Sequence, residues 1–308
     1  MNSKPRISII IFVDSLNPAL SDTIKGYARQ TCVLSTFELI VIDFKLSRDF
    51  SAEVEKICQL TDNNLNIKYF RHESNSRSVR NNFGVTQATA DLVVFISGDF
   101  IPQPGFIEAH LQFHQAHPEP QLVGIGSGFS PKSQRKKSKF LAWQEDSGSL
   151  FGVRLNEKDP VLPKNFFYVA NASIKKEFFL SVGMFDEDFP YDAWDDFEIS
   201  MRLAQHGMKS LYVPEAIAIH NHLLTLSERR KRIEWAGESA AILKSKYPDY
   251  HIPIRSPWKQ LIKSYINLLV YGVTRNSKYQ VNYWERTLEA AFTRGYLRGC
   301  QALDISRN

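Results

Sequence analysis

Cysteine is scarce in this chain of 308 residues, and long apolar runs are missing. The three cysteines, Cys32, Cys58 and Cys300, lie far apart and form no CxxC pair, which argues against a disulfide framework or zinc ribbon and favours a reducing compartment. No apolar run reaches the roughly 18 residues that cross a bilayer. The short apolar segment near the N-terminus predicts a strand rather than a signal peptide. We therefore expect a cytoplasmic protein that is not integral to a membrane.

Neither sign of charge is in large excess. The net charge of +5 is too small to predict nucleic-acid binding, but it suits phosphate-bearing ligands or an anionic membrane surface. The arginines and amides of RSVRNNFG at 77–84 could bind phosphate and a base or ribose, with a solvated loop as the alternative. Walker, GxGxxG and GxSxG motifs are absent, so nucleotide hydrolases, dinucleotide oxidoreductases and α/β-hydrolases all lose support.

Apolar β-branched runs alternate with amphipathic segments in the first third of the chain. Such alternation predicts an α/β fold with a parallel, doubly wound sheet. Ligands bind outside the carboxyl ends of parallel strands, so Val13, Asp43 and Asp99 should lie on one rim. The predicted strands are 7–13, 37–44, 67–71 and 92–97, and the predicted helices between them are 17–30, 49–60 and 78–88.

The pattern changes after Asp99, and the second half of a site is expected there. From Ser227 onward the pattern is helical. The intervening sequence predicts a helix at 105–116, a strand at 121–128, a flexible basic stretch at 132–139, helices at 175–182 and 195–207, and short strands at 211–213 and 216–220.

Two groups of carboxylates could carry chemistry. Asp99 follows a buried strand, where a divalent cation could be held between protein and diphosphate oxygens, or it could simply cap a turn. Three acids crowd a helix start beside Trp194, namely Asp195, Asp196 and Glu198. Capping explains one or two of them, and a general base working near neutral pH is the alternative.

Two pairs of histidines are candidate metal ligands. His110 and His114 have the i, i+4 spacing of a metal site on one helix face, but the polar surface of an amphipathic helix is the commoner origin of such a pattern. His220 and His222 follow a predicted strand, and a neutral imidazole there could complete a metal site with Asp99.

Several motifs follow one another in a specific order over roughly residues 6–222. They are ISIIIFV, a strand ending in Asp43, RNNFGVTQATADLVVFISGDFIPQPGF, VANASIKKEFFLSVGMFDEDF, WDDFEISMRLAQHG and VPEAIAIHNH. In this order the sequence resembles the family 2 glycosyltransferases, and most of all the bacterial branch with a galactosyltransferase-like C-terminal region. The resemblance implies a GT-A type, Rossmann-like fold, in which helices flank a mostly parallel central sheet, with a C-terminal helical extension.

The resemblance also implies domain boundaries. Residues 1–225 would form the GT-A domain, with a nucleotide-binding half at about 1–128 and an acceptor half at about 129–225. Residues 226–308 would form the helical extension.

Position by position, the resemblance assigns roles to residues of this sequence. Asp196 takes the place of the catalytic base, and Asp195 and Trp194 lie at the acceptor. Asp99 occupies the metal position of the DxD motif and His220 is a further metal ligand, for Mn²⁺ or Mg²⁺. The donor-binding positions are Phe12, Val13, Asp43, Arg80, Asn82, Ser97 and Gly98.

The implied reaction is hexosyl transfer from a nucleotide-diphosphate sugar, with a UDP-sugar favoured, to a hydroxyl of a glycan or lipid-linked acceptor. Inversion at the anomeric carbon and a role in cell-surface polysaccharide or glycolipid synthesis are implied with it. No nucleic-acid partner is expected, and a homo-oligomer is compatible with the sequence.

Some positions depart from the family pattern. Phe44 replaces an acid after Asp43, and Ser97 replaces the first aspartate of DxD. The arginine-asparagine pair can be aligned as Arg80-Asn81 or as Asn81-Asn82. A non-catalytic GT-A module that binds a nucleotide sugar or glycan and assists another transferase is therefore the alternative function.

The C-terminal segment carries a separate prediction. Its basic residues Lys259, Lys263, Arg275 and Lys278 are interleaved with apolar and aromatic residues, a pattern that could lie on an anionic membrane surface. Peripheral contact with the inner face of the cell membrane would follow. Packing against the catalytic domain or a second subunit is the alternative.

Overall fold

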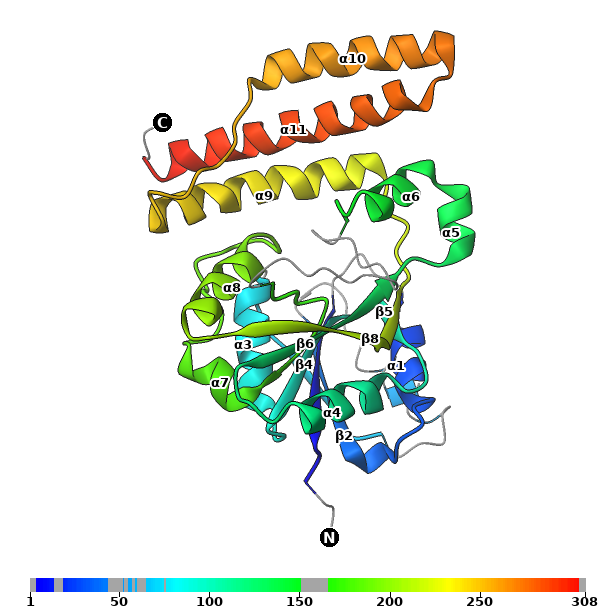
Figure 1. Cartoon of the computed structure of the whole chain (residues 1–308), viewed down its shortest axis with the longest axis vertical. Helices are drawn as coiled ribbons and strands as arrows, with labels where there is room; N and C mark the ends of the chain where they lie inside the picture. Colours follow the sequence, from blue (N-terminus) through cyan, green and yellow to red (C-terminus); the bar gives the residue numbers. More distant parts are fainter. Residues whose placement is uncertain are drawn as a thin grey trace. The chain divides into compact units, whose positions relative to one another are not determined.

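The computed structural model describes residues 4–13, 19–43, 65–74, 76–150 and 166–304, together with residues 52, 55, 56 and 59. The chain divides into two compact units, and it passes between them more than once (Figure 1). We call the first the sheet domain; it consists of Met1–Glu187 and Asp196–Leu223. The second, the helical unit, consists of Asp188–Asp195 and Leu224–Asn308.

An eight-stranded sheet with the order β3-β2-β1-β4-β7-β6-β8-β5 forms the centre of the sheet domain. The first four strands in that order are parallel, as the sequence predicts. The sheet becomes mixed at β7, which pairs antiparallel with both β4 and β6. The strands are β1 (Ile7–Val13), β2 (Phe37–Asp43), β3 (Ile67–Arg71), β4 (Leu92–Ser97), β5 (Phe100–Pro102), β6 (Leu122–Phe129), β7 (Asn171–Lys175) and β8 (Lys209–His220).

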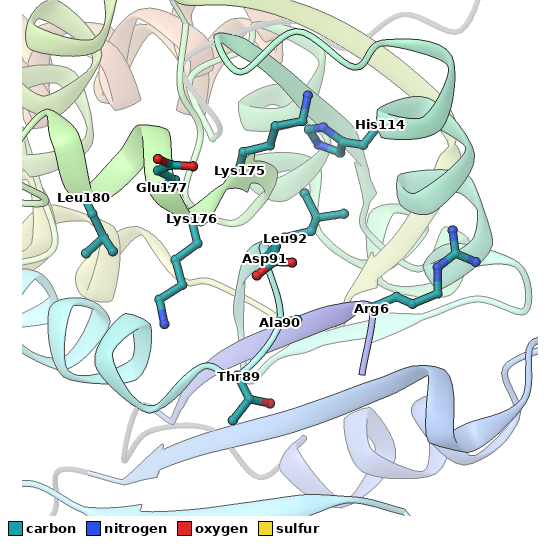
Figure 2. A pocket seen from close by; sticks show the side chains of 10 residues that line it. All are labelled: Arg6, Thr89, Ala90, Asp91, Leu92, His114, Lys175, Lys176, Glu177 and Leu180. Atoms are coloured by element: carbon teal, nitrogen blue, oxygen red, sulfur yellow. The ribbon is translucent and has the colours of Figure 1, made fainter. Parts of the chain in front are cut away.

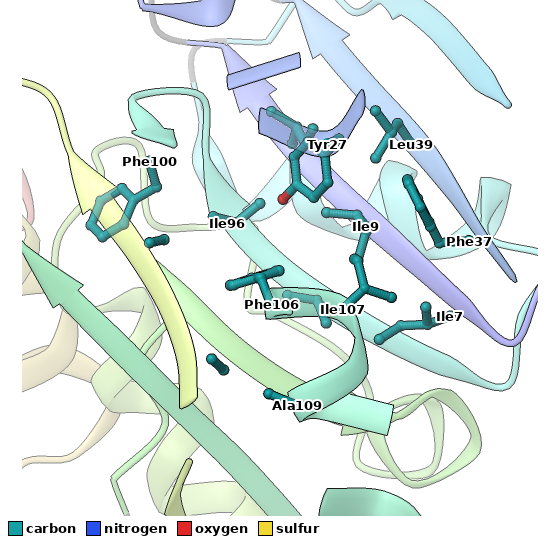
Figure 3. Packing of buried hydrophobic residues seen from close by; sticks show 14 of the residues in the cluster. Ile7, Ile9, Tyr27, Phe37, Leu39, Ile96, Phe100, Phe106, Ile107 and Ala109 are labelled. Atoms are coloured by element: carbon teal, nitrogen blue, oxygen red, sulfur yellow. The ribbon is translucent and has the colours of Figure 1, made fainter. Parts of the chain in front are cut away.

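Side chains of the central strands alternate between two buried clusters, one on each face of the sheet. On one face, Ile7 and Ile9 of β1 pack with Tyr27 and Phe106 from the covering helices (Figure 3). On the other face, Ile10 belongs to the second cluster. The helices of this domain are α1 (Leu20–Ala28), α3 (Arg77–Gln87), α4 (Phe106–Ala116), α5 (Lys132–Lys137), α6 (Lys139–Asp146), α7 (Lys176–Ser181) and α8 (Asp195–Gln205), with a 3-10 turn η1 (Leu34–Thr36).

Some local predictions differ from the structure. The basic stretch 132–139, expected to be flexible, forms the whole of α5 and the first residue of α6. Ser138 lies between the two helices and caps α6 through its side chain. The two short strands expected at 211–213 and 216–220 are one strand, β8, whose pairing with β6 shifts register at Gly126/Ser127. The predicted helix at 49–60 lies mostly outside the described residues.

The histidines of α4 lie in the core and not on the surface expected from their spacing. His110 is fully buried, with Nδ1 at 2.9 Å from the Ser173 hydroxyl and Nε2 at 3.0 Å from the Asn171 side-chain oxygen. His114 Nε2 lies 2.9 Å from the same hydroxyl. Asn171 also donates to the carbonyls of Ser127 and Ala216, at 3.0 and 2.9 Å. This polar network joins α4 to β6, β7 and β8, which accounts for these histidines without a metal.

Burial sets the protonation of both histidines. It lowers the pKa of His110 to about 4 and, together with the charges of His110 and Lys175, lowers the pKa of His114 to about 3. A histidine in the unfolded chain has a pKa near 6.5. The unfolded state therefore binds more protons than the folded state once the pH falls below about 6.5.

We expect the free energy of unfolding to fall from about pH 6.5 to about pH 4, by about 1.4 kcal/mol per pH unit for each of the two histidines. His114→Gln should remove one of these contributions and flatten the slope, although it lowers stability at pH 7. Urea unfolding followed by circular dichroism at a series of pH values measures this. His251→Gln, a change at an exposed histidine, is the matched control and should keep the slope.

Gly84 allows α3 to lie directly on the sheet. A Cβ atom at this position would lie 2.5 Å from Ile10 Cγ2 and 2.7 Å from Ile42 Cδ1. Both isoleucines are fully buried on neighbouring strands, and side chains in close-packed interiors move at a cost.

Gly84→Ala should therefore destabilise the sheet domain by about 1–3 kcal/mol despite the better helix propensity of alanine. Gly272→Ala is the matched control, because no atom lies within 4 Å of the Cβ that it would add. We expect it to be neutral or slightly stabilising. Equal losses in the two variants, measured by denaturant unfolding, would contradict the close approach at Gly84.

The helical unit is built from α9 (Leu226–Lys246), α10 (Pro257–Thr274) and α11 (Ser277–Ala302). Helices α9 and α11 approach at glycines: a Cβ on Gly237 would lie 2.6 Å from the backbone nitrogen of Tyr296. Arg298 of α11 pairs with Glu234 and Glu238 of α9. Among the described residues, each helix is too short or too polar to span a bilayer.

Candidate functional site

The strand ends predicted to share a rim do lie side by side. Val13 at the end of β1 pairs in register with Asp43 at the end of β2, and Phe12 pairs with Ser97 at the end of β4. Gly98 donates its N–H to the carbonyl of Phe12 at 3.0 Å, and a Cβ on this glycine would lie 3.1 Å from the same oxygen. The turn after β4 is thus held against β1.

Asp99 lies between two histidines from the end of β8. Its Oδ2 is 3.3 Å from His220 Nε2 and 3.2 Å from His222 Nδ1. One ligand atom from each of the three residues can be chosen so that all three lie within 4.8 Å of one another. His222 joins the predicted pair of Asp99 and His220 because it is two residues along the chain from His220.

Strand pairing explains how residues so distant in sequence meet. Phe100 of β5 pairs antiparallel with His220 of β8, and the N–H of Asn221 donates to the carbonyl of Asp99 at 2.8 Å. The rings of Phe100 and His220 also pack, with centroids 4.8 Å apart. The backbone therefore places His220 beside Asp99, whatever the side chains contribute.

The surroundings of Asp99 favour its charged form. Burial by itself would raise the pKa of this carboxyl group, but the charge and hydrogen bond of His220, with hydrogen bonds from His222 and Ser97, hold the pKa well below its usual value. Oδ1 of Asp99 is buried and has no hydrogen-bond partner among the described residues. A buried carboxylate oxygen without a donor is costly unless a cation or water binds it. The carboxylate and the two imidazoles fit a divalent cation of the Mn²⁺ type.

Arg80 of α3, a predicted donor-binding residue, is buried beside the end of β1. Its side chain is 1% exposed, its Nε donates to the Ser76 carbonyl at 3.2 Å, and its guanidinium lies 5.8 Å from the ring centroid of Phe12. Asp43 accepts a hydrogen bond of 2.7 Å from the Tyr69 hydroxyl. Phe44, the other departure near this point, lies outside the described residues.

The two asparagines that follow Arg80 differ in their surroundings. Asn82 donates to the Phe185 carbonyl and to Glu187, each at 2.9 Å, and accepts from the Phe185 N–H at 3.0 Å, so it holds the loop after α7. Its donor-binding role stays a prediction. Asn81 is fully buried, and neither its side-chain oxygen nor its nitrogen has a partner among the described residues. The amide without a partner in the described part of the chain is thus that of Asn81, the residue that the alignment as Arg80-Asn81 places at the asparagine position.

Asp196 is the second residue of α8 and is partly exposed. Its Oδ2 lies 3.6 Å from a guanidinium nitrogen of Arg77, the first residue of α3, and its Oδ1 accepts the Phe197 N–H at 2.9 Å. The sequence singled out the segment of Arg77 for phosphate, whereas the structure pairs this arginine with the expected base. The position of Arg77 in the sequence, at the start of a helix, does not predict that it pairs with Asp196.

Glu198, the third acid of this cluster, has a structural role. Arg202 donates to both of its carboxylate oxygens, at 2.7 and 2.6 Å, and also donates to the carbonyls of Val182 and Met184. The pair therefore fastens α8 to the loop after α7, which removes Glu198 from the candidates for chemistry.

Trp194 has an unusual backbone just before α8. Its φ is 69°, in the left-handed region that non-glycine residues rarely adopt. The indole ring lies 6.2 Å from the ring of Tyr250 and 6.4 Å from that of Phe292, both in the helical unit, as is Trp194 itself. Strain of this kind is common at functional sites.

A pocket of the sheet domain lies at the ends where β1 and β4 begin (Figure 2). Arg6, just before β1, and Leu92, at the start of β4, are among its lining residues, and its lining includes none of the predicted site residues. Lys176 donates to the Ala88 carbonyl at 2.6 Å, and Lys175 donates to the His117 carbonyl at 3.0 Å. Lys175 and Lys176 therefore bind backbone carbonyls of the loops that flank this pocket.

Curated relatives of this chain are glycosyltransferases. Validoxylamine A glucosyltransferase of Streptomyces hygroscopicus subsp. jinggangensis is 26% identical over 232 residues, covering 66% of this chain and 52% of the relative. Pre-mycofactocin glycosyltransferase of Mycobacterium tuberculosis is 27% identical over 238 residues, covering 74% of this chain and 47% of the relative. The chain thus spans about half the length of the curated relatives it matches.

Solved structures share the fold at low sequence identity. A mannosyltransferase from Pyrobaculum calidifontis, in complex with GDP-Man and Mn²⁺, has a TM-score of 0.63 and 15% identity, over 97% of this chain and 88% of that one. TarS of S. aureus (residues 1–349), in complex with UDP-GlcNAc, has a TM-score of 0.53 and 11% identity, over 98% and 93% of the two chains. These likenesses confirm the expected GT-A type architecture.

The strand ends, the acidic turn beside two histidines and the arginine-paired aspartate all lie within the sequence that one family model covers. That model, described as glycosyltransferase like family 2, matches residues 8–263, which is most of the chain. The chain belongs to family 2 of the glycosyltransferases.

Proposed function

We propose that this protein transfers a hexosyl group from a nucleoside-diphosphate sugar to a hydroxyl of a glycan or lipid-linked acceptor, with inversion at the anomeric carbon. The observation that carries the proposal is Asp99: a buried carboxylate oxygen without a hydrogen-bond partner among the described residues, beside His220 and His222. In this family position the group implied is a divalent cation bound with the diphosphate.

Asp99, His220 and His222 would hold the cation. Bound there, Mn²⁺ or Mg²⁺ would stabilise the negative charge that develops on the departing nucleoside diphosphate. The Ser97 hydroxyl, which lowers the pKa of Asp99 through a hydrogen bond, supports the carboxylate where the family usually has a second acid. The altered DxD sequence is therefore compatible with a working metal site.

Asp196 would act as the general base. Its carboxylate accepts the proton of the acceptor hydroxyl while the acceptor oxygen attacks the anomeric carbon and the bond from that carbon to the diphosphate oxygen breaks. One displacement from the opposite face inverts the configuration. Arg77, 3.6 Å away, would keep the carboxylate pointing toward the acceptor. Asp195 and Trp194 remain the proposed acceptor contacts.

The donor would lie across the ends of β1 and β2. Phe12, Val13 and Asp43 are the proposed base and ribose contacts, and Gly98 allows close approach of the backbone. Arg80 is the proposed diphosphate contact, and we add Asn81 for its unpartnered buried amide. The nucleotide half would be about 1–128 and the acceptor half about 129–225.

We place the reaction in cell-surface polysaccharide or glycolipid synthesis at the cytoplasmic side of the membrane. A UDP-sugar is the favoured donor, although the related folds were solved with both GDP-Man and UDP-GlcNAc. Titration with UDP, GDP and dTDP therefore determines which nucleotide the protein binds.

One prediction of this function concerns the metal site. One of the three nucleotides should bind in calorimetric titration only when Mn²⁺ or Mg²⁺ is present, and Asp99→Asn should weaken that binding at least about tenfold. Asp91→Asn, the same change at an exposed aspartate at the start of β4, is the matched control and should leave binding unchanged. Equal binding with and without metal would contradict the assignment.

Another prediction concerns the general base, Asp196. Asp196→Asn should lower kcat by about 10²- to 10⁴-fold and leave nucleotide affinity unchanged, because the residue acts on the acceptor proton. Release of nucleoside diphosphate from the bound donor, with a glycan acceptor, measures the rate. Transfer that survives this change would contradict the assignment of Asp196 as the base. A folded protein that binds a nucleotide but releases no nucleoside diphosphate from any donor would favour the non-catalytic module instead.

A further inference from the structure

Helix α10 presents a polar face to its own unit. The Ser264 hydroxyl, 2% exposed, lies 2.7 Å from the Thr287 hydroxyl of α11 and 3.3 Å from the Tyr283 carbonyl. Gln260, 5% exposed, accepts from Arg286 at 3.2 Å. The two buried side chains of α10 are thus polar and hydrogen-bonded, where a helix of a water-soluble bundle would bury its apolar stripe.

The apolar stripe of α10 is exposed instead. Trp258 is 75% exposed, Leu269 is 72% exposed and Val273 is 87% exposed. With Ile262, Tyr265 and Ile266 they follow the spacing i, i+4, i+7, i+8, i+11, i+15, which is one continuous helix face. An exposed stripe of this length on one helix is well beyond the scattered apolar residues of an ordinary surface.

The charged residues of the sequence segment that contains α10 have one sign. The sequence from residue 250 to 284 contains no aspartate or glutamate. It contains the exposed basic residues Lys259, Lys263, Arg275 and Lys278 on α10 and just after it. Lys259 and Lys263 flank the apolar stripe, so their ammonium groups can stay in water while their stems lie along it.

We propose that the exposed face of α10 docks on an anionic phospholipid surface. The helix would lie in the plane of the interface, with its apolar stripe in the boundary between headgroups and acyl chains and its basic residues among the phosphates. This proposal goes beyond the sugar-transfer function and does not depend on it.

Charge distinguishes lipid from a second copy of the chain. A two-fold dimer through this face would pair the same patch with itself and bring the basic residues of both copies together with no acid on α10 to offset them. An anionic bilayer supplies the opposite charge at the same place as the apolar phase.

The full chain should co-sediment with vesicles made of equal parts phosphatidylcholine and phosphatidylglycerol, and only weakly with phosphatidylcholine alone. Added salt should weaken the binding. Lys263→Gln should lower the partition constant about fivefold, the effect of removing one cation at an anionic surface. Val273→Asp should lower it at least about tenfold through loss of apolar contact and charge repulsion.

Val33→Asp is the matched control. Val33 is also an exposed valine, 72% accessible, but lies in the sheet domain just before η1. Its variant should bind vesicles as the unchanged protein does. Because all three changes are at exposed side chains, the unfolding midpoints should stay the same and report on folding independently.

Three results would overturn the proposal. One is no binding to either vesicle; another is equal binding to both with no effect of salt. The third is a dimer in sedimentation equilibrium that Val273→Asp dissociates while vesicles are not bound, which would assign the face to a second copy. Nucleotide titration of the same samples separates these results from failure of the sugar-transfer function.

Discussion

The candidate site depends on one backbone pairing, that of the short strand β5 with the end of β8. This pairing places Phe100 opposite His220 and lets Asn221 donate to the carbonyl of Asp99 at 2.8 Å. Asp99 and His222 are 123 residues apart in sequence, so the loop-closure entropy of bringing them together is offset by the sheet as a whole and not by their own interaction. The two imidazoles then support a buried charge that would be costly alone. The topology of the sheet therefore sets the positions of Asp99, His220 and His222.

Much of this topology can be predicted from sequence, and the reason is physical. Parallel strands end on the same edge, so the ends of β1, β2 and β4 had to meet once their apolar runs were identified, and Val13 does pair with Asp43. The arrangement beyond Asp99 is harder, because a three-residue strand such as β5 has too few residues to show a period. A different limit hides that β8 is one strand: its pairing with β6 shifts register between Gly126 and Ser127, and such a shift leaves no periodic pattern in the sequence. Side-chain partners over long distances, such as Arg77 with Asp196, leave no local pattern at all.

The histidines show how identical residue types separate by environment. His110 and His114 have helical spacing that suits a metal, yet their nitrogens lie within hydrogen-bond distance of Ser173, and His110 also reaches Asn171, inside the core. Burial there lowers their pKa and keeps them neutral. His220 and His222 lie instead beside a carboxylate that has a free oxygen among the described residues. Spacing in sequence cannot distinguish these cases, because the difference is in what the neighbouring strands supply. The core pair has neutral partners, Ser173 and Asn171, whereas the other pair faces the carboxylate of Asp99.

The short segment 188–195 belongs to the helical unit, and the chain passes from that unit into the sheet domain between Asp195 and Asp196. The left-handed backbone at Trp194 costs free energy of order 1 kcal/mol or more, and it persists only where surrounding contacts fix it. Those contacts include the rings of Tyr250 and Phe292, which belong to the helical unit. Lys246 of α9 pairs with Asp188 at the start of the same short segment, at 2.5 Å. Within the helical unit, segment 188–195 is thus held at both ends by residues beyond 240.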